Sequence, residues 1–571
     1  MNIWWMVTAV IAGIVLAFLH TQLKKYVSSK VLLAMEVILA CIAAVFLFQS
    51  FQWNAAISII SCLAYSFLMY SITFPNEDGY EKMKNELHKA ESEKIELIKN
   101  PVRLFIDFLF TFVIIGISII YFVFGSSYSV LSTVLLFANV VLICQMLKKA
   151  LLFHDLDVFV NKETNCLYLL SKISPKRYPF SELIEANMET NVDVLKLFPL
   201  FTLFSTNQDY TTSMGKTLKL TFSGETVYLN IKNDPSWLSA VNRMEEQVET
   251  AEIKQVEVLP FYHPKNLKRL LGKGYFAISV KGVGAYTTLI VILSFFNVPV
   301  WVMAMAAFSY WAFNLYISDR LLKIALDAKK VEDPNVLSAA KKVLAKAGIP
   351  NVNIYQTETN ELNGFAAGAN IGRSMITLTT ETLKLPIEAI EAILAHEAIH
   401  VKKRDIFIGQ IMRMAMIGLV VSFVFWIYTF LKGQQLLLFF IIWVFLLLFP
   451  FIQSLLTQWM EVRADHLGAV LLDHGNQQMA DGLTTLAAKQ DELFQKAKTY
   501  DLHKEEESHS LLERDSWFMR LLEFQFMIHP PMYWRIKSLR ETETGWNRGK
   551  LLKWLKDRFR ESFPDKKQMN E

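Results

Sequence analysis

Six long stretches of the chain contain no Asp, Glu, Lys or Arg, although the whole chain holds 58 basic and 54 acidic residues. These stretches are residues 1–23, 37–76, 108–147, 282–318, 414–431 and 433–460. An apolar stretch of about 20 residues is long enough to cross a bilayer as a helix. The sequence therefore predicts a polytopic membrane protein and excludes a simple soluble globule. The net charge of +4 favours neither nucleic acid nor an acidic partner.

Three of these stretches are too long for a single crossing and contain a polar break. The breaks are Gln52–Asn54, Gly125–Ser127 and Asn297–Pro299. Because exposed backbone is costly inside lipid, each long stretch is predicted to be a helical hairpin with its turn at the break. With single spans near 3–22, 414–431 and 436–456, about nine transmembrane helices are expected.

Basic residues gather in alternate loops between these spans. Lys24 and Lys25 follow the first span, Lys402–Arg404 precede the eighth, and Lys432 is the only basic residue in the other set of loops. This asymmetry predicts an N-terminus outside a cell membrane, with every soluble region and the C-terminus in the cytoplasm. The first span lacks a small-residue cleavage site, so we expect it to be retained. Four scattered cysteines predict neither disulfides nor a Cys-based zinc site.

The soluble segments differ in character. Residues 77–103 carry charges of both signs at helical spacing, which predicts a solvated helix in a cytoplasmic loop. Residues 153–260 contain short strand patterns, including a hairpin around Ser223-Gly224, and Asp234-Pro235 predicts the start of a helix. This arrangement resembles a small pleckstrin-homology-like barrel. We expect a β-rich cytoplasmic domain that has a regulatory or docking role or is an inert spacer.

Residues 319–405 have a mixed α and β pattern. Asp333-Pro334 predicts the start of an amphipathic helix that ends at Gly348, and strands are expected at Val352–Tyr355 and Met375–Thr379. Pro386 begins a further helix, whose second half contains His396-Glu397-Ala398-Ile399-His400. Residues four apart share a helix face, so both imidazoles can reach one metal ion, and Glu397 is placed to take a proton from water.

A catalytic zinc needs a third protein ligand. No histidine follows at short distance, but Glu461 stands just after the last span, with Asp465 one turn farther along the same face. A carboxylate such as Asp465 can hold a ligand imidazole by its second ring nitrogen. Asp405, five residues after His400, is a rival for that role. His466 points about 100° away from Asp465 and is expected at the surface.

Taken in order, these motifs resemble the HtpX and CAAX prenyl endopeptidase family of membrane gluzincins over residues 319–541. Two more elements match: Asn363-Gly364-Phe365-Ala366-Ala367-Gly368 is similar to the family's Asn-Ala-Phe-Ala-Thr-Gly loop, and His529-Pro530-Pro531 with Arg535-Ile536 is similar to its C-terminal element. Gly364 and Ala367 depart from the family pattern.

The resemblance implies one Zn²⁺ bound by His396, His400 and Glu461, with Glu397 as general base and then proton donor. It also implies that His529 steadies the oxyanion and that Arg535 holds the Glu461 helix. Asn363 and the strand at Met375–Thr379 would border the cleft and receive an extended substrate by strand addition.

The expected fold is mainly α, with a cytoplasmic α+β gluzincin-type domain and the small β-rich domain. The division is a membrane domain (1–152), the β-rich domain (153–260), a transmembrane hairpin (261–318) and a protease domain (319–571) that includes the hairpin 406–456. The expected function is zinc endopeptidase action on membrane-associated or misfolded proteins at the cytoplasmic face, in membrane protein quality control or regulated proteolysis.

Three alternatives stay open. One is a CAAX-type protease of prenylated proteins, and another is a non-catalytic sensor or scaffold working through 153–260. An intramembrane site-two-type protease is disfavoured, because Lys402–Arg404 follow the motif directly. The expected partners are the bilayer and protein or peptide substrates, without nucleic acid, and the oligomeric state is left open.

Overall fold

A computed structural model describes residues 3–24, 26–74, 78–89, 92–124, 130–198, 205–232, 254–277, 298–368, 374–431, 433–501 and 510–564, with a few isolated residues between them. The chain forms two compact units, each assembled from segments that are distant in sequence. Unit 1 comprises Met1–Val192, Asn207–Pro260 and Ala497–Glu505. Unit 2 comprises Asp193–Thr206, Phe261–Lys496 and Glu506–Glu571.

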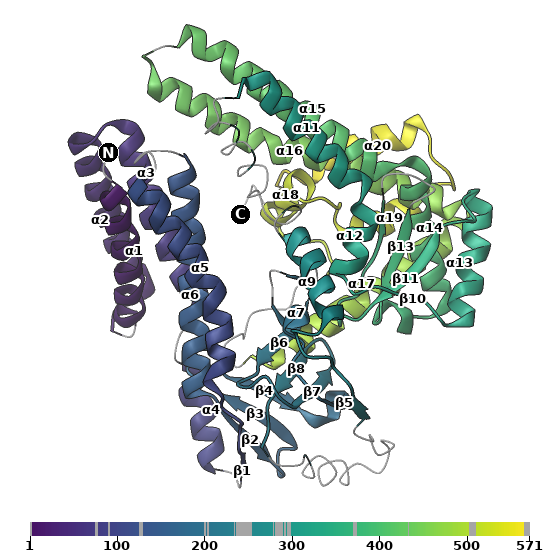
Figure 1. Ribbon diagram of the computed structural model, residues 1–571. Helices are drawn as coiled ribbons and strands as arrows, with labels where there is room; N and C mark the ends of the chain where they lie inside the picture. The colour runs from purple at the N-terminus through teal and green to yellow at the C-terminus, as the bar shows by residue number, and fades with distance from the viewer. Residues whose placement is uncertain are drawn as a thin grey trace. The chain divides into compact units, whose positions relative to one another are not determined.

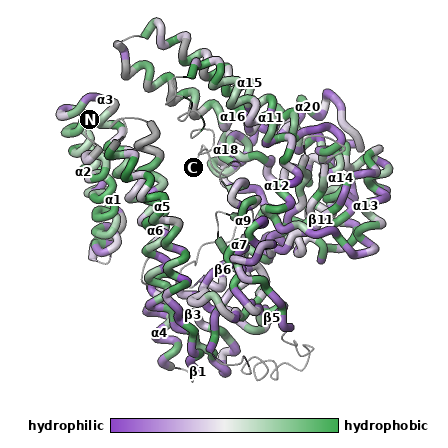
Figure 2. Tube along the Cα trace, viewed as in Figure 1, coloured by the Kyte–Doolittle hydropathy of each residue, from purple (hydrophilic) through white to green (hydrophobic). Residues whose placement is uncertain are grey.

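The first part of unit 1 is a set of long apolar helices (Figures 1 and 2). They are α1 (Ile3–Leu23), α2 (Ser29–Ser50), α3 (Trp53–Thr73), α5 (Pro101–Phe124) and α6 (Val130–Asp155). The break between α2 and α3 lies at the polar residues predicted for the first hairpin. Many of their large apolar side chains are exposed, Phe46 by 64% and Val123 by 65%, as expected of helices that face lipid.

Within the described residues, six helices are long and apolar enough to cross a membrane: these five and α15 (Asp405–Phe430). A seventh is counted if α11 (Val300–Tyr316) and α12 (Ser318–Ala325), which meet at a bend of 62°, form one span. The first arm of the predicted third hairpin, 283–296, falls almost wholly outside the described residues. The predicted ninth span lies within α16 (Gln435–Ala469). The count of nine and the four-part division therefore stay predictions.

Two antiparallel-rich sheets complete unit 1. One has the order β1-β2-β3-β4 and the other the order β6-β8-β7-β5-β9. Their strands are β1 (Ser92–Ile95), β2 (Asp157–Asn161), β3 (Cys166–Leu170), β4 (Lys176–Pro179), β5 (Leu183–Glu189), β6 (Asn207–Tyr210), β7 (Thr217–Phe222), β8 (Thr226–Leu229) and β9 (Lys254–Val256), with a 3-10 turn η1 (Phe180–Glu182). Side chains from both sheets share one apolar core. The helix predicted at Asp234-Pro235 falls on residues outside those described.

The prediction of one solvated helix over 77–103 was wrong. Helix α4 (Asp78–Lys89) is followed by β1, which pairs with β2 along its whole length, and α5 begins only at Pro101. The sequence does not show the alternation typical of a strand, because Ile95 is the only buried residue of β1. Lys94 instead forms an ion pair with Asp157, and Glu93 forms one with Lys162. Backbone pairing and cross-strand charges, which local helical spacing cannot report, determine this element.

A short segment after the last long helix of unit 2 also belongs to unit 1. Tyr500 is fully buried, and its ring centroid lies 4.8 Å from that of Tyr178. The Tyr178 ring in turn stacks on Phe222. The Tyr500 hydroxyl donates to Glu182 and to the Ser223 carbonyl, and the Arg177 amide donates to the Tyr500 carbonyl at 2.9 Å. The β-rich core therefore includes a residue that lies 318 positions from Glu182, one of its hydrogen-bond partners.

Unit 2 is built on a four-stranded sheet of order β10-β11-β13-β12, packed against helices (Figure 1). The strands are β10 (Lys329–Lys330), β11 (Asn353–Thr357), β12 (Gly364–Ala367) and β13 (Met375–Thr379). The helices are α7 (Val194–Leu197), α9 (Pro264–Phe276), α11, α12, α13 (Pro334–Ala347), η6 (Thr382–Lys384), α14 (Ile387–Lys403), α15, α16, α17 (Gly475–Thr499), α18 (Trp517–Phe526), α19 (Met532–Arg540) and α20 (Arg548–Glu561).

The boundaries of α13 confirm the sequence prediction and its reason. The Asp333 side chain accepts hydrogen bonds from the Asn335 and Val336 amides, which caps the helix N-terminus. Gly348 ends the helix at a φ of +76°, a conformation that glycine adopts without strain. The apolar sides of α13, α14 and α16 then meet in the largest core of the chain.

Candidate metal centre

Helix α14 carries the HExxH motif. Apolar residues at helical spacing bury one side of the helix, and the helix ends at Arg404, whose φ is +57°. His396 and Glu397 are buried and His400 is half-buried. Both imidazoles therefore leave the helix on one face, as their spacing of four predicts.

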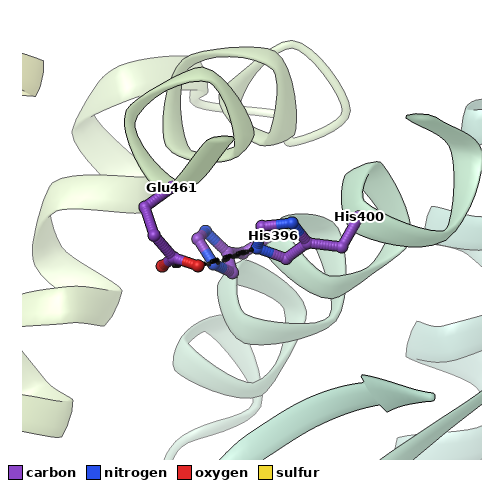
Figure 3. A group of neighbouring side chains, drawn as sticks. All are labelled: His396, His400 and Glu461. Atoms are coloured by element: carbon purple, nitrogen blue, oxygen red, sulfur yellow. Dashed lines mark hydrogen bonds and ion pairs between the residues drawn. The ribbon is translucent and has the colours of Figure 1, made fainter. Parts of the chain in front are cut away.

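Helix α16 brings Glu461 to this face (Figure 3). One Glu461 carboxylate oxygen lies 3.3 Å from His396 Nε2 and the other lies 3.3 Å from His400 Nε2. The two Nε2 atoms are 3.0 Å apart. Ligand atoms of all three residues lie within 4.8 Å of one another, so the group is compact enough to hold a metal ion.

The other ring nitrogen of each histidine is occupied by a carboxylate. His396 Nδ1 lies 2.8 Å from Asp465, and His400 Nδ1 lies 2.8 Å from Asp405. The two aspartates are thus not rivals, because each orients a different imidazole. With Nδ1–H donating to these carboxylates, both Nε2 lone pairs face Glu461. Two imidazole nitrogens and one carboxylate oxygen match the donor types that zinc accepts, and three protein ligands leave a position open.

Arginines hold the two aspartates in turn. Arg535 on α19 donates to both oxygens of Asp465, at 2.8 and 2.7 Å, and lies 3.8 Å from Glu461. This agrees with the expectation that Arg535 holds the Glu461 helix. Arg463 donates to Asp405, a contact that the sequence pattern did not predict. The sequence did contain one indication of this contact: Arg463 is a basic residue between the acidic residues Glu461 and Asp465.

Burial and charge act against each other at the motif. Burial lowers the pKa of His396, but the carboxylates of Asp465 and Glu461 outweigh it and raise that pKa to about 9. Burial raises the pKa of Glu397 above that of an ordinary glutamate.

His529 and β12 border the group. His529 Nδ1 lies 2.8 Å from Glu461, while the side chain stays 55% exposed. The Ala366 amide of β12 donates to the Glu397 carboxylate, which puts Glu397 beside this strand. The Asn363 backbone, just before β12, is fixed by hydrogen bonds with Thr379 and Thr382.

The expectation that Met375–Thr379 receives a substrate strand was wrong. This strand, β13, is buried throughout and pairs with β11 on one side and β12 on the other. Its backbone groups are therefore already used. In this sheet β12 is the edge strand on the side of Glu397, and only an edge can accept a further strand.

The prediction that His466 lies at the surface was also wrong. His466 is 1% exposed, and its Nε2 lies 3.4 Å from the Ser538 hydroxyl, with the Trp546 ring 6.0 Å away. Helix α16 is covered on this side by later parts of the chain, so a position 100° from Asp465 is still interior. Burial lowers the pKa of His466 to about 4.

Comparison with protein families matches two parts of the chain. Residues 157–245 match the bacterial PH domain family, in agreement with the resemblance noted for this segment. Residues 330–543 match peptidase family M48 and include every residue of the metal group.

Individual relatives match over shorter lengths. A protein of Pelotomaculum thermopropionicum described as "Protease HtpX homolog" is 32% identical over 103 residues, which cover 17% of this chain and 37% of that protein. A protein of Persephonella marina with the same description is 32% identical over 142 residues, which cover 24% of this chain and 46% of that protein. The chain thus spans less than half the length of these relatives. The crystal structure of S. mikatae Ste24p is similar over 48% of this chain and 65% of that one, with a TM-score of 0.34 and 16% identity.

Proposed function

We propose that this chain, whose residues 330–543 match peptidase family M48, is a membrane-embedded, zinc-dependent endopeptidase. The observation that carries this proposal is the convergence of His396, His400 and Glu461, with Glu397 beside them. Glu397 follows the first of these side chains directly. A proton acceptor next to a three-ligand metal group is the arrangement that metal-dependent peptide hydrolysis uses.

Each residue has a role under this proposal. Zinc, when bound by His396, His400 and Glu461, supplies Lewis-acid chemistry that polarises the scissile carbonyl. Glu397 takes a proton from the attacking water and gives it to the leaving amine. Asp465 and Asp405 keep the imidazoles in the tautomer with a free Nε2. His529, half-exposed beside Glu461, donates a hydrogen bond to the developing oxyanion.

The substrate is an extended segment of a membrane-associated or misfolded protein. It adds to the edge of β12 that faces away from β13, where main-chain hydrogen bonds give affinity without demanding one sequence. Support comes from the position of Ala366 of β12 next to the Glu397 carboxylate. A substrate strand on this edge would bring its scissile bond to the proton acceptor.

The catalytic segment faces the cytoplasm in this proposal, in a multi-pass protein of the cell membrane. The support is the concentration of Lys and Arg in alternate loops. A cysteine introduced at Lys537 should be protected from impermeant thiol reagents on intact cells, while one at Gln434, between α15 and α16, should react. The reverse pattern contradicts the orientation.

The catalytic proposal is tested by cleavage of an unfolded, casein-like reporter by the purified full-length protein. Wild type should cleave it, lose cleavage when a chelator removes the metal, and regain it when zinc is restored. Glu397→Gln should remain inactive in zinc. Cleavage that survives both chelation and Glu397→Gln contradicts the zinc mechanism.

A sensor or scaffold role is favoured by one observation, the match of residues 157–245 to bacterial PH domains. Wild type that cleaves no reporter, although it binds zinc, would favour that role. Cleavage restricted to prenylated reporters would instead favour the CAAX-type activity.

A further inference from the structure

Large apolar side chains are exposed along residues 511–528, which comprise α18 and its flanks. We name this segment the apolar ledge. Its exposed members are Leu511, Leu512, Trp517, Phe518, Met519, Phe526, Met527 and Ile528, each between 36% and 54% exposed. Water-facing surfaces seldom gather so many large apolar side chains in one short segment, and such a cluster marks a protein or membrane interaction site.

The ledge is fixed to α16 by hydrogen bonds from two α16 side chains. Ser454 donates to the Met527 carbonyl at 2.6 Å. The Gln458 amide reaches the carbonyls of Met527 at 2.9 Å and Glu523 at 2.8 Å. The exposed residues therefore have a defined position along α16.

That position is the end of the predicted membrane-spanning part of α16. Ser454 and Gln458 lie in the last turns of the uncharged stretch 433–460, and Glu461 follows directly. The start of α15 lies at the same place, because its first residue, Asp405, contacts His400. The ledge is thus at the level where two apolar helices meet the metal group, and Figure 2 shows α18 beside α16.

We propose that the apolar ledge is inserted in the bilayer, at the boundary between headgroups and acyl chains, without crossing it. Trp and other large apolar side chains favour this depth. The ledge runs directly into His529, so bilayer contact would hold this residue at the membrane surface. A protein segment leaving the bilayer would then meet the metal group without crossing open water. Contact between the ledge and lipid does not depend on whether the chain hydrolyses peptides.

The depth of the ledge can be measured by spin labelling in proteoliposomes. A nitroxide is attached to Phe518→Cys, and separately to Ile528→Cys, in full-length Glu397→Gln protein that also carries Cys41→Ser, because Cys41 is the exposed native cysteine. The matched control is Lys537→Cys on α19, whose side chain is 57% exposed. Collision rates are recorded with oxygen, which concentrates in lipid, and with a water-soluble nickel chelate.

Lipid insertion predicts an oxygen-to-nickel collision ratio several-fold higher at 518 and 528 than at 537. Equal ratios would place the ledge in water and overturn the proposal. Low collision rates with both reagents would mean that protein, such as a second copy of the chain, covers the ledge, which also overturns it. The second labelled position guards against local misfolding at the first. The readout needs no catalysis, so its failure would leave the proposed protease activity standing.

Discussion

At the scale of single residues, the site consists of paired contacts that align the imidazoles. Each histidine of the motif binds one aspartate, and each aspartate binds one arginine. Asp405 and Asp465 are both almost fully buried, so their charges depend on these partners. The aspartates are therefore positioning residues.

Asp405→Asn should weaken zinc binding about 10- to 100-fold, because the amide orients His400 less firmly than the carboxylate does. Competition with a fluorescent chelator measures the affinity in the purified protein. Asp473→Asn is the control, since Asp473 forms only exposed ion pairs with Lys342 and Lys346. Equal affinity for Asp405→Asn and the control would remove Asp405 from the positioning role.

The buried His466 should make stability depend on pH. Its pKa is about 4 in the folded chain, against about 6.5 when unfolded, so the unfolded chain binds the extra proton between these values. Neutral His466 therefore contributes about 3 kcal/mol to the free energy of unfolding above pH 6.5, and this contribution is lost as the pH falls toward 4. Thermal unfolding of His466→Gln should show a smaller loss between pH 7 and 4.5 than wild type and the His474→Gln control show. Identical pH profiles would count against this.

The motif residues could be predicted from the sequence because helix spacing alone puts His396 and His400 on one face. Glu461 and Asp465 followed from their spacing of four and from their position after a span. Arg463 and the burial of His466 could not be predicted in this way. The Arg463 contact depends on where the start of α15 lies against α16, and the burial of His466 depends on the later segments that cover α16; both are properties of tertiary packing.

At the scale of elements, the metal group depends on close packing of α16 against α14. Gly468 makes this possible: a Cβ there would lie 2.8 Å from Met479 and 3.1 Å from backbone atoms of Ala395 and His396. The α14 backbone cannot yield without moving His396 itself. The distance from Glu461 to the histidines is thus set partly by a residue without a side chain.

Gly468→Ala should therefore push α16 away from α14 and reduce both zinc affinity and reporter cleavage by at least tenfold. Gly409→Ala is the matched control, because a Cβ at Gly409 meets nothing within 4 Å. Both quantities are measured on the same detergent-purified samples. A Gly468→Ala protein that matches the control would show that the helices tolerate the extra methyl group.

Elements with strong periodicity, such as α13 and the motif helix, were predictable with their caps. Strands were predictable where apolar residues alternate, as in β7 and β8. The edge strands were not, because β1 and β12 carry few buried side chains and owe their place to backbone pairing with β2 and β13. The substrate edge was accordingly predicted on β13, one strand too far inside.

At the scale of the whole molecule, chain order and spatial order differ. Unit 1 takes Ala497–Glu505 from beyond the motif, and unit 2 takes Asp193–Thr206 from within the β-rich segment. In unit 2, Asp193 pairs with Arg269 and Lys196 with Glu358. Composition shifts along the sequence cannot reveal such exchanged segments, because each is too short to have a composition of its own.

Tyr500→Ala should loosen the β-rich core by about 3 to 5 kcal/mol, the usual cost of removing a buried aromatic ring. Hydrogen exchange in the full-length protein should show faster exchange in β3, β4 and β7. Tyr500→Phe keeps the ring packing and loses only the bonds to Glu182 and Ser223, so it should exchange more slowly than the alanine variant. Unchanged exchange in Tyr500→Ala would mean that the segment is dispensable to the core.

The central claim is that one zinc ion is held by His396, His400 and Glu461 and that Glu397 acts beside it. The most direct measurement is metal content by mass spectrometry, with reporter cleavage recorded on the same preparations. We expect one zinc per chain in wild type and in Glu397→Gln, with cleavage only in wild type, and neither zinc nor cleavage in Glu461→Ala. A folded Glu461→Ala protein that keeps a full zinc ion and cleaves the reporter would contradict this claim.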